Sequence, residues 1–187
     1  MSVAPHPDWL RPPVGGWTAE DLDRLPDLPP HTELIDGSLI FVSPQTLFHM
    51  RTIRALERAL EGAVEPGWDV WREMTVRLNR KNRPEPDLAV VADSAFRGLK
   101  QTFCLPEDVL LVVEVVSEES EERDRHTKPR KYAAAGIRYL WRVEEDRGRP
   151  VVYTYELDPT TGSYLPTGIF RDTIKLEQPF PVTIEFP

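Results

Sequence analysis

Two carboxylates and a lysine stand where an ordinary protein core would not require them. Asp87 lies at the start of the apolar run 86–91, and Glu114 interrupts the apolar run 109–116. A charge inside a buried strand is costly unless it is paired or holds a metal ion. Lys128 follows, four residues before Tyr132. Two acids on neighbouring strands with a cation nearby therefore suggest a metal-dependent hydrolytic site.

The chemistry of such a site follows from its donor atoms. Something must relieve the repulsion between Asp87 and Glu114: a proton, a cation or a metal ion. Oxygen donors favour hard divalent cations, so we expect Mg²⁺, with Mn²⁺ as a substitute. Cys104 is the only cysteine, which excludes a site built on thiolates. The ion could activate a water and offset the charge of an in-line displacement, and a nearby lysine could stabilise that charge.

The composition predicts one globular domain, residues 1–187. The chain has 187 residues, of which 40% are hydrophobic and 29% charged, enough for a sizeable core. The longest apolar run, 109–113, is too short to span a bilayer, and the first eight residues lack the pattern of a secretory signal. With a single cysteine, these features predict a cytoplasmic protein that does not associate with membranes.

The overall charge argues against a protein that coats nucleic acid non-specifically. The formal net charge is −8, whereas such binding depends on neutralising phosphates with lysine and arginine. A local basic groove remains compatible with this charge, because four basic residues cluster in 77–83: Arg77, Arg80, Lys81 and Arg83. The more ordinary interpretation of that cluster is a solvated loop beside a strand.

The first half of the chain predicts an irregular arm, a hairpin, a helix and a strand. The arm covers residues 1–16, and a short helix should follow at 19–24. Asp36-Gly37 between apolar segments predicts a hairpin. Apolar residues at helical spacing in 45–62 predict a helix, whose apolar face includes His49, so this side chain should point to the interior. Alternation in 68–78 predicts a strand.

The second half predicts buried strands around another helix. The runs 87–92 and 109–116 are apolar enough to be strands covered on both faces. An alanine-rich helix should end near Gly136, and Pro129, tolerated only in the first turn, places Lys128 at its start. Strands at 137–143 and 151–157 and shorter β segments up to residue 184 should follow. The whole is a mixed α/β domain.

A series of segments resembles the bacterial Uma-type restriction-endonuclease family, within the PD-(D/E)xK nuclease superfamily. The match rests on order and spacing over residues 32–145 rather than on any single motif. In order, the matching segments are Glu33-Leu34-Ile35-Asp36-Gly37, Ser43-Pro44 with His49, residues 86–91, residues 112–117, Asp124-Arg125 with Lys128 and Tyr132, and Ala135-Gly136-Ile137 leading to Tyr139-Leu140-Trp141.

The resemblance implies a fold. It is a restriction-endonuclease-like mixed β-sheet flanked by helices, with 32–145 as the nuclease-like core. An additional N-terminal hairpin and a β-rich extension, 150–187, complete the expected domain.

The resemblance also implies site residues. Asp87 and Glu114 would bind the metal, with the Val115 carbonyl as a possible third ligand. The broad superfamily has a lysine two positions after the acid, where this chain has Val116, and Lys128 on the following helix is the match for that lysine. His49 and Glu33 match positions that line the same site. The implied activity is a Mg²⁺-dependent endonuclease acting on DNA, with a homodimer as a possible assembly.

The residues by themselves leave other interpretations open. Asp87 could be a turn residue at the start of a strand, and Glu114 could form a buried salt bridge to Lys128 or Arg138. His49 could be a satisfied core histidine, Lys128 an exposed residue at a helix start, and Glu33 a polar strand residue. The acidic run Glu118-Glu119 and Glu121-Glu122 reads as a solvated loop.

Two other functions also remain open. The chain could be a catalytically silent binding or assembly module with this fold, whose partner is a protein. It could also be a metal-dependent phosphodiesterase that acts on small nucleotides.

Overall fold

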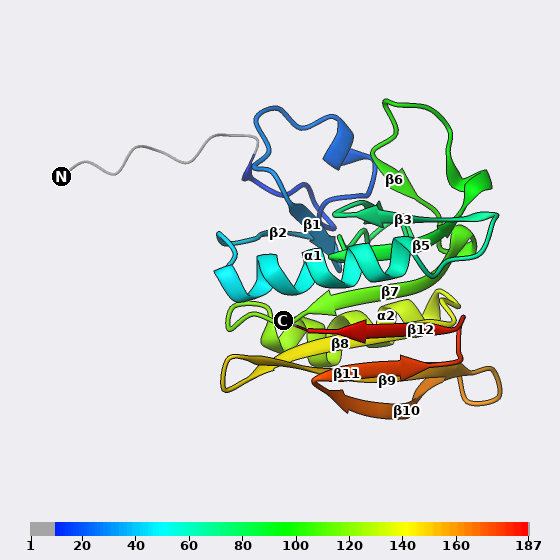
Figure 1. Ribbon diagram of the computed structural model, residues 1–187. Coiled ribbons are helices and arrows are strands. Elements are labelled where there is room, and N and C mark those ends of the chain that lie inside the picture. The colour runs from blue at the N-terminus through cyan, green and yellow to red at the C-terminus, as the bar shows by residue number, and fades with distance from the viewer. Residues whose placement is uncertain (1–9, 187) are drawn as a thin grey trace.

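A six-stranded mixed sheet runs through the centre of the computed structural model, which describes residues 10–186 (Figure 1). The strand order is β10-β9-β8-β7-β5-β3. The bounds of these strands are Ser163–Arg171 for β10, Arg149–Asp158 for β9, Tyr139–Asp146 for β8, Val109–Val115 for β7, Leu88–Ala92 for β5 and Trp68–Arg72 for β3.

One parallel pair makes the sheet mixed. Strands β7 and β8 are parallel, and the other pairs of the sheet are antiparallel. Parallel neighbours need a crossover, which here is a π-helical turn, Arg123–Thr127, that continues into helix α2, Lys128–Ala134. This crossover carries Lys128 back over the strand that carries Glu114.

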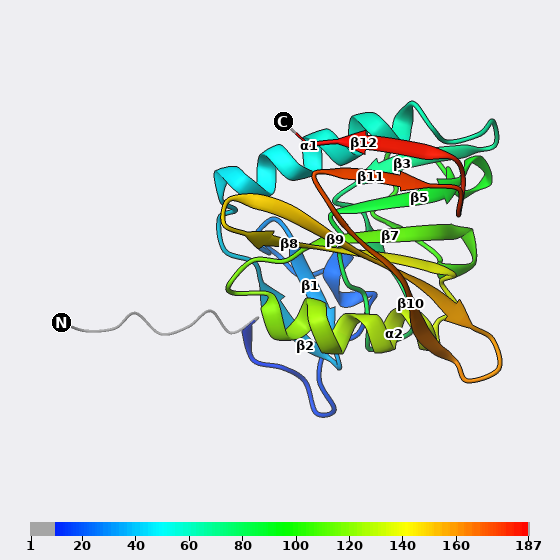
Figure 2. The same cartoon turned by 60° about the horizontal axis from the view of Figure 1, so that its bottom comes forward.

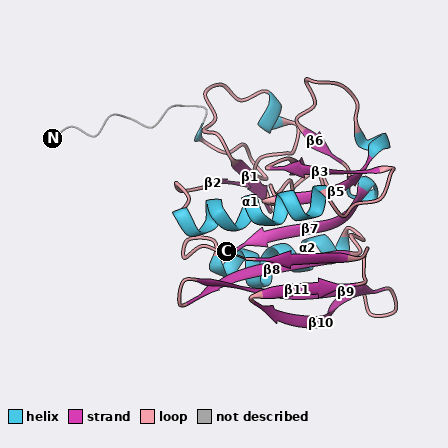
Figure 3. Ribbon diagram, viewed as in Figure 1, coloured by secondary structure: helices cyan, strands magenta, loops and turns pink. Residues whose placement is uncertain are grey.

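Three small strand pairs surround the sheet. The hairpin β1 (Thr32–Ile35) and β2 (Ser38–Phe41) is closed by Asp36 and Gly37, whose φ angles of 50° and 76° confirm the predicted tight turn. The short strands β4 (Thr75–Val76) and β6 (Phe103–Cys104) are parallel. The hairpin β11 (Thr173–Leu176) and β12 (Val182–Glu185) ends the chain, so the second half is rich in strands, as expected (Figure 3).

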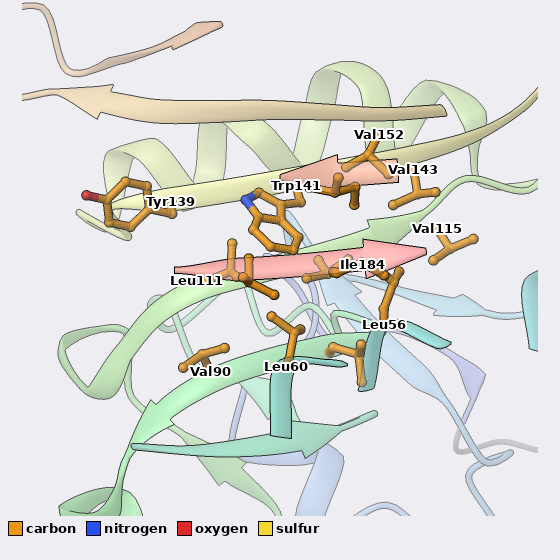
Figure 4. Packing of buried hydrophobic residues seen from close by; sticks show 14 of the residues in the cluster. Leu56, Leu60, Val90, Leu111, Val115, Tyr139, Trp141, Val143, Val152 and Ile184 are labelled. Carbon is orange, nitrogen blue, oxygen red and sulfur yellow. The ribbon is translucent and has the colours of Figure 1, made fainter. Parts of the chain in front are cut away.

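Helices α1 (Leu47–Glu61) and α2 lie on opposite sides of the sheet (Figure 2). One apolar cluster packs against α1 and the β11–β12 hairpin (Figure 4). It includes Leu56, Val113, Trp141 and Ile184. Against α2 packs a second cluster around Val112 and Tyr132. Alternation along β7 explains the split, because successive side chains of a strand point to opposite faces.

Helix α1 forms where the apolar periodicity predicts it. The Thr46 side chain accepts a hydrogen bond from the His49 backbone N–H and so caps the first turn. Ile53, Leu56 and Leu60 are fully buried on one face, while the opposite face is exposed. The predicted bounds, 45–62, differ from the observed ones by one or two residues at each end.

Three predicted elements differ from the structure. The strand predicted at 68–78 is broken at Glu73, which has a φ of 51°, so β3 and β4 belong to different sheets. The helix predicted at 19–24 is only a 3₁₀ turn, Asp21–Asp23. Lys128 begins α2, but helical residues 121–127 precede it, so it lies inside a longer helical segment.

The domain division stays a prediction, and residues 1–9 of the predicted arm lie outside the described residues. Within residues 10–186, no helix is both long and apolar enough to cross a membrane.

Candidate active site

Strand pairing places Asp87 and Glu114 opposite each other. Leu88 of β5 pairs with Val113 of β7 in an antiparallel register, so the next residues outward, Asp87 and Glu114, also face each other. Glu114 contacts Lys128 and Tyr132 of α2, whereas Asp87 contacts His49 of α1. The Val115 backbone N–H donates to Asp87 Oδ2 at 2.6 Å, which fixes the aspartate against the end of β7.

Lys128 lies among three carboxylates. Its Nζ is 2.8 Å from Glu33 Oε1, 3.1 Å from Glu114 Oε2 and 3.2 Å from Asp124 Oδ1. All four residues are buried, with at most 4% of each exposed. The interpretation of Lys128 as an exposed residue is therefore wrong. The alternative of a buried salt bridge from Glu114 to Lys128 is what the structure shows, while Arg138 pairs with Glu156.

Asp124 and Tyr132 complete this cluster, and the sequence reasoning assigned them no role. The Tyr132 hydroxyl donates to Glu114 Oε1 at 2.5 Å. Asp124, Lys128 and Tyr132 are spaced four residues apart, which places them on one face of a helix. That spacing was the signal in the sequence, and it was missed because Lys128 was placed at the start of a helix rather than inside one.

His49 reaches the site from α1. Its Nε2 lies 3.1 Å from Asp87 Oδ1, and only 3% of the residue is exposed. The prediction that His49 points inward is confirmed. The imidazole has a carboxylate partner, so it is satisfied, and that partner is the predicted site acid.

Glu33 joins the β1–β2 hairpin to the site. Its Oε1 contacts Lys128 and accepts a hydrogen bond from the Glu85 backbone N–H at 2.8 Å. Its Oε2 is buried without a hydrogen-bond partner among the residues that the structure describes. A buried carboxylate oxygen in that state is costly, so it is a point at which a further proton or cation would bind favourably.

Burial governs the electrostatics of the cluster. Burial raises the pKa of Glu114 well above its usual range, although Lys128 counteracts it, and burial likewise raises the pKa of Asp124. Burial alone would lower the pKa of Lys128, but Glu114, Glu33 and Asp124 outweigh it and raise that pKa. The lysine is therefore charged at neutral pH, and the acids around it are too many for one cation.

These side chains line a cavity of about 410 Å³ beneath the β1–β2 hairpin. Six carboxylates line it: Glu33, Glu73, Glu85, Asp87, Glu114 and Asp124. The lysine and arginine in its lining are Lys128 and Arg123, so the cavity has an excess of negative charge. At its rim, His31 Nδ1 lies 2.5 Å from Glu85 Oε1.

The donor set suits a hard divalent cation. Within residues 10–186, no three acidic, histidine or cysteine side chains are already arranged around one point as metal ligands. However, Asp87, Glu114 and Val115 line one cavity. A carboxylate has about four lone-pair sites, so the hydrogen bonds to Asp87 and Glu114 leave acceptor capacity for an ion. The negative excess and the unpartnered Glu33 oxygen favour a cation there.

Two of the four basic residues in 77–83, Lys81 and Arg83, hold other parts of the chain in place. Lys81 Nζ donates to the backbone carbonyls of Gly15, Gly16 and Trp17, at 2.6 to 2.9 Å. Arg83 is 2% exposed and pairs with Asp23. Lys81 and Arg83 therefore belong neither to a basic groove nor to a solvated loop. By contrast, the acidic run around Glu118 and Glu121 is exposed, as expected.

Comparison with known proteins agrees with this architecture. The model of the family described as "Uma2: Putative restriction endonuclease" matches residues 19–187. A crystal structure of a putative nuclease belonging to DUF820, from Anabaena variabilis, is similar with a TM-score of 0.66 and 15% identity, over 87% of this chain and 89% of that one. At that identity, the likeness shows the fold alone. No curated protein matches the chain. The family match over 19–187 shows that the chain belongs to the Uma2 restriction-endonuclease family, and its fold is a nuclease fold.

Proposed function

We propose that this protein is a Mg²⁺-dependent endonuclease of the cytoplasm that hydrolyses phosphodiester bonds in DNA. The observation that carries the proposal is the opposed pair Asp87 and Glu114, which shares one acidic cavity with Lys128. Family and fold support nuclease chemistry in general, and the donor set supports the choice of metal.

Each residue has a proposed role at this cavity. Asp87 and Glu114, with the Val115 carbonyl, would hold the ion, which supplies Lewis acidity toward a phosphoryl oxygen when it is bound. Lys128 would stabilise the negative charge that develops on the phosphate or orient the attacking water. His49 holds the Asp87 carboxylate in place, and Glu33 holds the Lys128 ammonium, through the contacts described above.

Plasmid nicking tests the proposal. Wild-type protein and the Glu114→Gln variant are incubated with supercoiled plasmid and Mg²⁺ or Mn²⁺, with EDTA as the metal-free control. We expect metal-dependent nicking that falls by about 100- to 1,000-fold in the variant, the order of loss seen when one group that stabilises a transition state is removed. Glutamine keeps the shape of Glu114 and can still accept from Tyr132.

A matched variant separates chemistry from general charge effects. Glu118→Gln makes the same change at an exposed acid on the loop after β7 and should nick like the wild type. Equal nicking by Glu114→Gln and wild type, with both proteins folded, would refute the assignment of the site.

A silent binding module is the second candidate, and one observation favours it. Both oxygens of Glu114 already have partners, Lys128 and Tyr132, so this carboxylate is satisfied without a metal. A silent module should neither nick plasmid nor bind DNA when Mg²⁺ is present, which size-exclusion chromatography with light scattering would show. The same measurement tests the homodimer, since cutting both strands commonly uses two sites.

The size of the cavity is also compatible with a phosphodiesterase that acts on small nucleotides. Hydrolysis of a chromogenic phosphodiester without plasmid nicking would identify that activity.

A further inference from the structure

The exposed face of α1 carries three arginines in one row. Arg51, Arg54 and Arg58 are exposed and three or four residues apart, so they form a stripe along the side of the helix away from the core. The buried face of the same helix already packs on the sheet. The arginines therefore have no part in holding α1 in place.

These guanidinium groups are unpaired. Within residues 10–186, Arg51, Arg54 and Arg58 make no side-chain hydrogen bond or ion pair with another described residue. Glu57 is the acid between Arg51 and Arg58 in the sequence, and its Oε2 lies 3.6 Å from Nη1 of Arg72 instead. Arginines elsewhere are commonly paired, such as Arg83 with Asp23 and Arg125 with Glu144. The row therefore presents positive charge to solvent in a chain with a net charge of −8.

The stripe borders a groove. A hollow of about 720 Å³ lies between α1, the turn at Gly148 and the C-terminal Phe186, and the three arginines line it. Glu145 is the one acid among the described residues of its lining. A polyanion in this groove would meet three cations and one anion.

The length of the stripe suits a phosphate backbone, although the stripe and the candidate active site use different faces of α1. Arg51 follows the buried His49 by two positions, which is about 200° around the helix, so the two side chains point in opposite directions. From Arg51 to Arg58 the helix rises about 10 Å, and one DNA strand carries a phosphate about every 3.4 Å of axis. The row is thus long enough to follow about three phosphates.

We propose that Arg51, Arg54 and Arg58 form a surface of α1 that binds the phosphate backbone of duplex DNA. The choice of DNA as the ligand rests on the proposed function. The placement of the surface rests on the stripe, its lack of acid partners and its groove.

The test measures binding rather than cleavage. Fluorescence anisotropy with a labelled 20-base-pair duplex, in EDTA, compares wild type with the triple variant Arg51→Gln, Arg54→Gln, Arg58→Gln across a series of salt concentrations. Loss of three phosphate contacts should reduce the slope of log affinity against log salt by about 2.7 and weaken binding by about tenfold or more. Glutamine forms helices nearly as well as arginine, so α1 should persist.

Two controls sharpen the result. The triple variant Arg24→Gln, Arg80→Gln, Lys100→Gln removes the same charge from exposed positions outside the groove and should keep the wild-type slope. Glu145→Gln removes the acid of the groove and should tighten binding.

The proposal is overturned if the α1 variant keeps the wild-type affinity and salt slope, if both triple variants lose them equally, or if the wild type does not bind the duplex. Salt-dependent binding through α1 in a protein that never nicks plasmid would uphold this surface and refute the proposed nuclease function.

Discussion

On the α1 face of the central sheet the buried cluster is apolar, whereas on the α2 face the same strands bury a group of charges beside a second apolar cluster. Strand β7 contributes to both faces: Val113 and Val115 pack toward α1, and Val112 and Glu114 point toward α2. The first face stabilises the fold by removing apolar area from water. The second holds acids that are costly to bury. The difference shows which layer supports the fold and which is available for chemistry.

The largest effect on stability should come from Lys128→Met. The substitution leaves Glu33, Glu114 and Asp124 without their shared cation, and breaking a buried charge cluster in this way costs about 3–5 kcal/mol. Urea unfolding at pH 7 measures it, with the exposed Lys100→Met as the control. Equal stability of the two variants would mean that the cluster is hydrated rather than buried.

Leu56→Ala tests the apolar face. Leu56 is fully buried between α1 and the sheet, so its truncation should cost about 2–5 kcal/mol. Because no site residue changes, metal-dependent nicking at a temperature where the variant is folded should match the wild type. Leu99→Ala, at a position that is 96% exposed, should cost almost nothing. Loss of nicking in folded Leu56→Ala would contradict the view that the α1 face supports the fold without taking part in the chemistry.

Tyr132→Phe should have a smaller effect. It removes the donor to Glu114 Oε1 and leaves that buried oxygen with one partner fewer, at a cost of about 1–3 kcal/mol. Tyr153→Phe, at a half-buried tyrosine whose ring stacks on Arg142 outside the site, is the control. Thermal unfolding compares the melting temperatures of the two variants. If they are equal, the hydrogen bond from Tyr132 does not stabilise the fold.

A pH dependence follows from the burial of Glu114. Burial raises the pKa of Glu114 above its ordinary value of 4.5. At any pH between 4.5 and this raised pKa, the folded chain therefore binds more protons than the unfolded chain. The stability contributed by the protonated form is therefore complete below about pH 4.5 and is lost as the pH rises through the raised pKa, by up to about 1.4 kcal/mol per pH unit. Urea unfolding at several pH values should show that the free energy of unfolding falls less steeply with rising pH in Glu114→Gln than in the wild type. The same dependence on pH in both proteins would contradict the raised pKa.

Much of the fold could be predicted from local sequence patterns. The Asp36-Gly37 turn, the apolar face of α1 and the apolar strands β5 and β7 each depend on neighbouring residues, and all of them are confirmed. The break at Glu73 could not be predicted from alternation, because the pattern continues across it while the backbone turns. Long-range contacts override a local pattern of that kind.

The placement of the candidate site residues could be predicted where strand or helix periodicity indicated it. Buried charges in apolar runs identified Asp87 and Glu114, and helical spacing placed His49 inward. The contacts of Lys81 with the backbone near Gly15 join parts of the chain about 65 residues apart, and no local pattern reveals such pairing. The role of Asp124 depended on a π-helical turn, which also lets Lys128 lie directly before Pro129 inside a helical segment.

Everything proposed for the cavity depends on a metal site formed by Asp87 and Glu114. Isothermal titration of Mn²⁺ into wild-type protein and into the Asp87→Asn variant, without nucleic acid, tests it most directly. We expect one specific Mn²⁺ ion per chain in the wild type and a loss of that binding in the variant, which keeps a side chain of the same size. Wild-type protein that binds no Mn²⁺, or a folded variant that binds it equally well, would contradict the account.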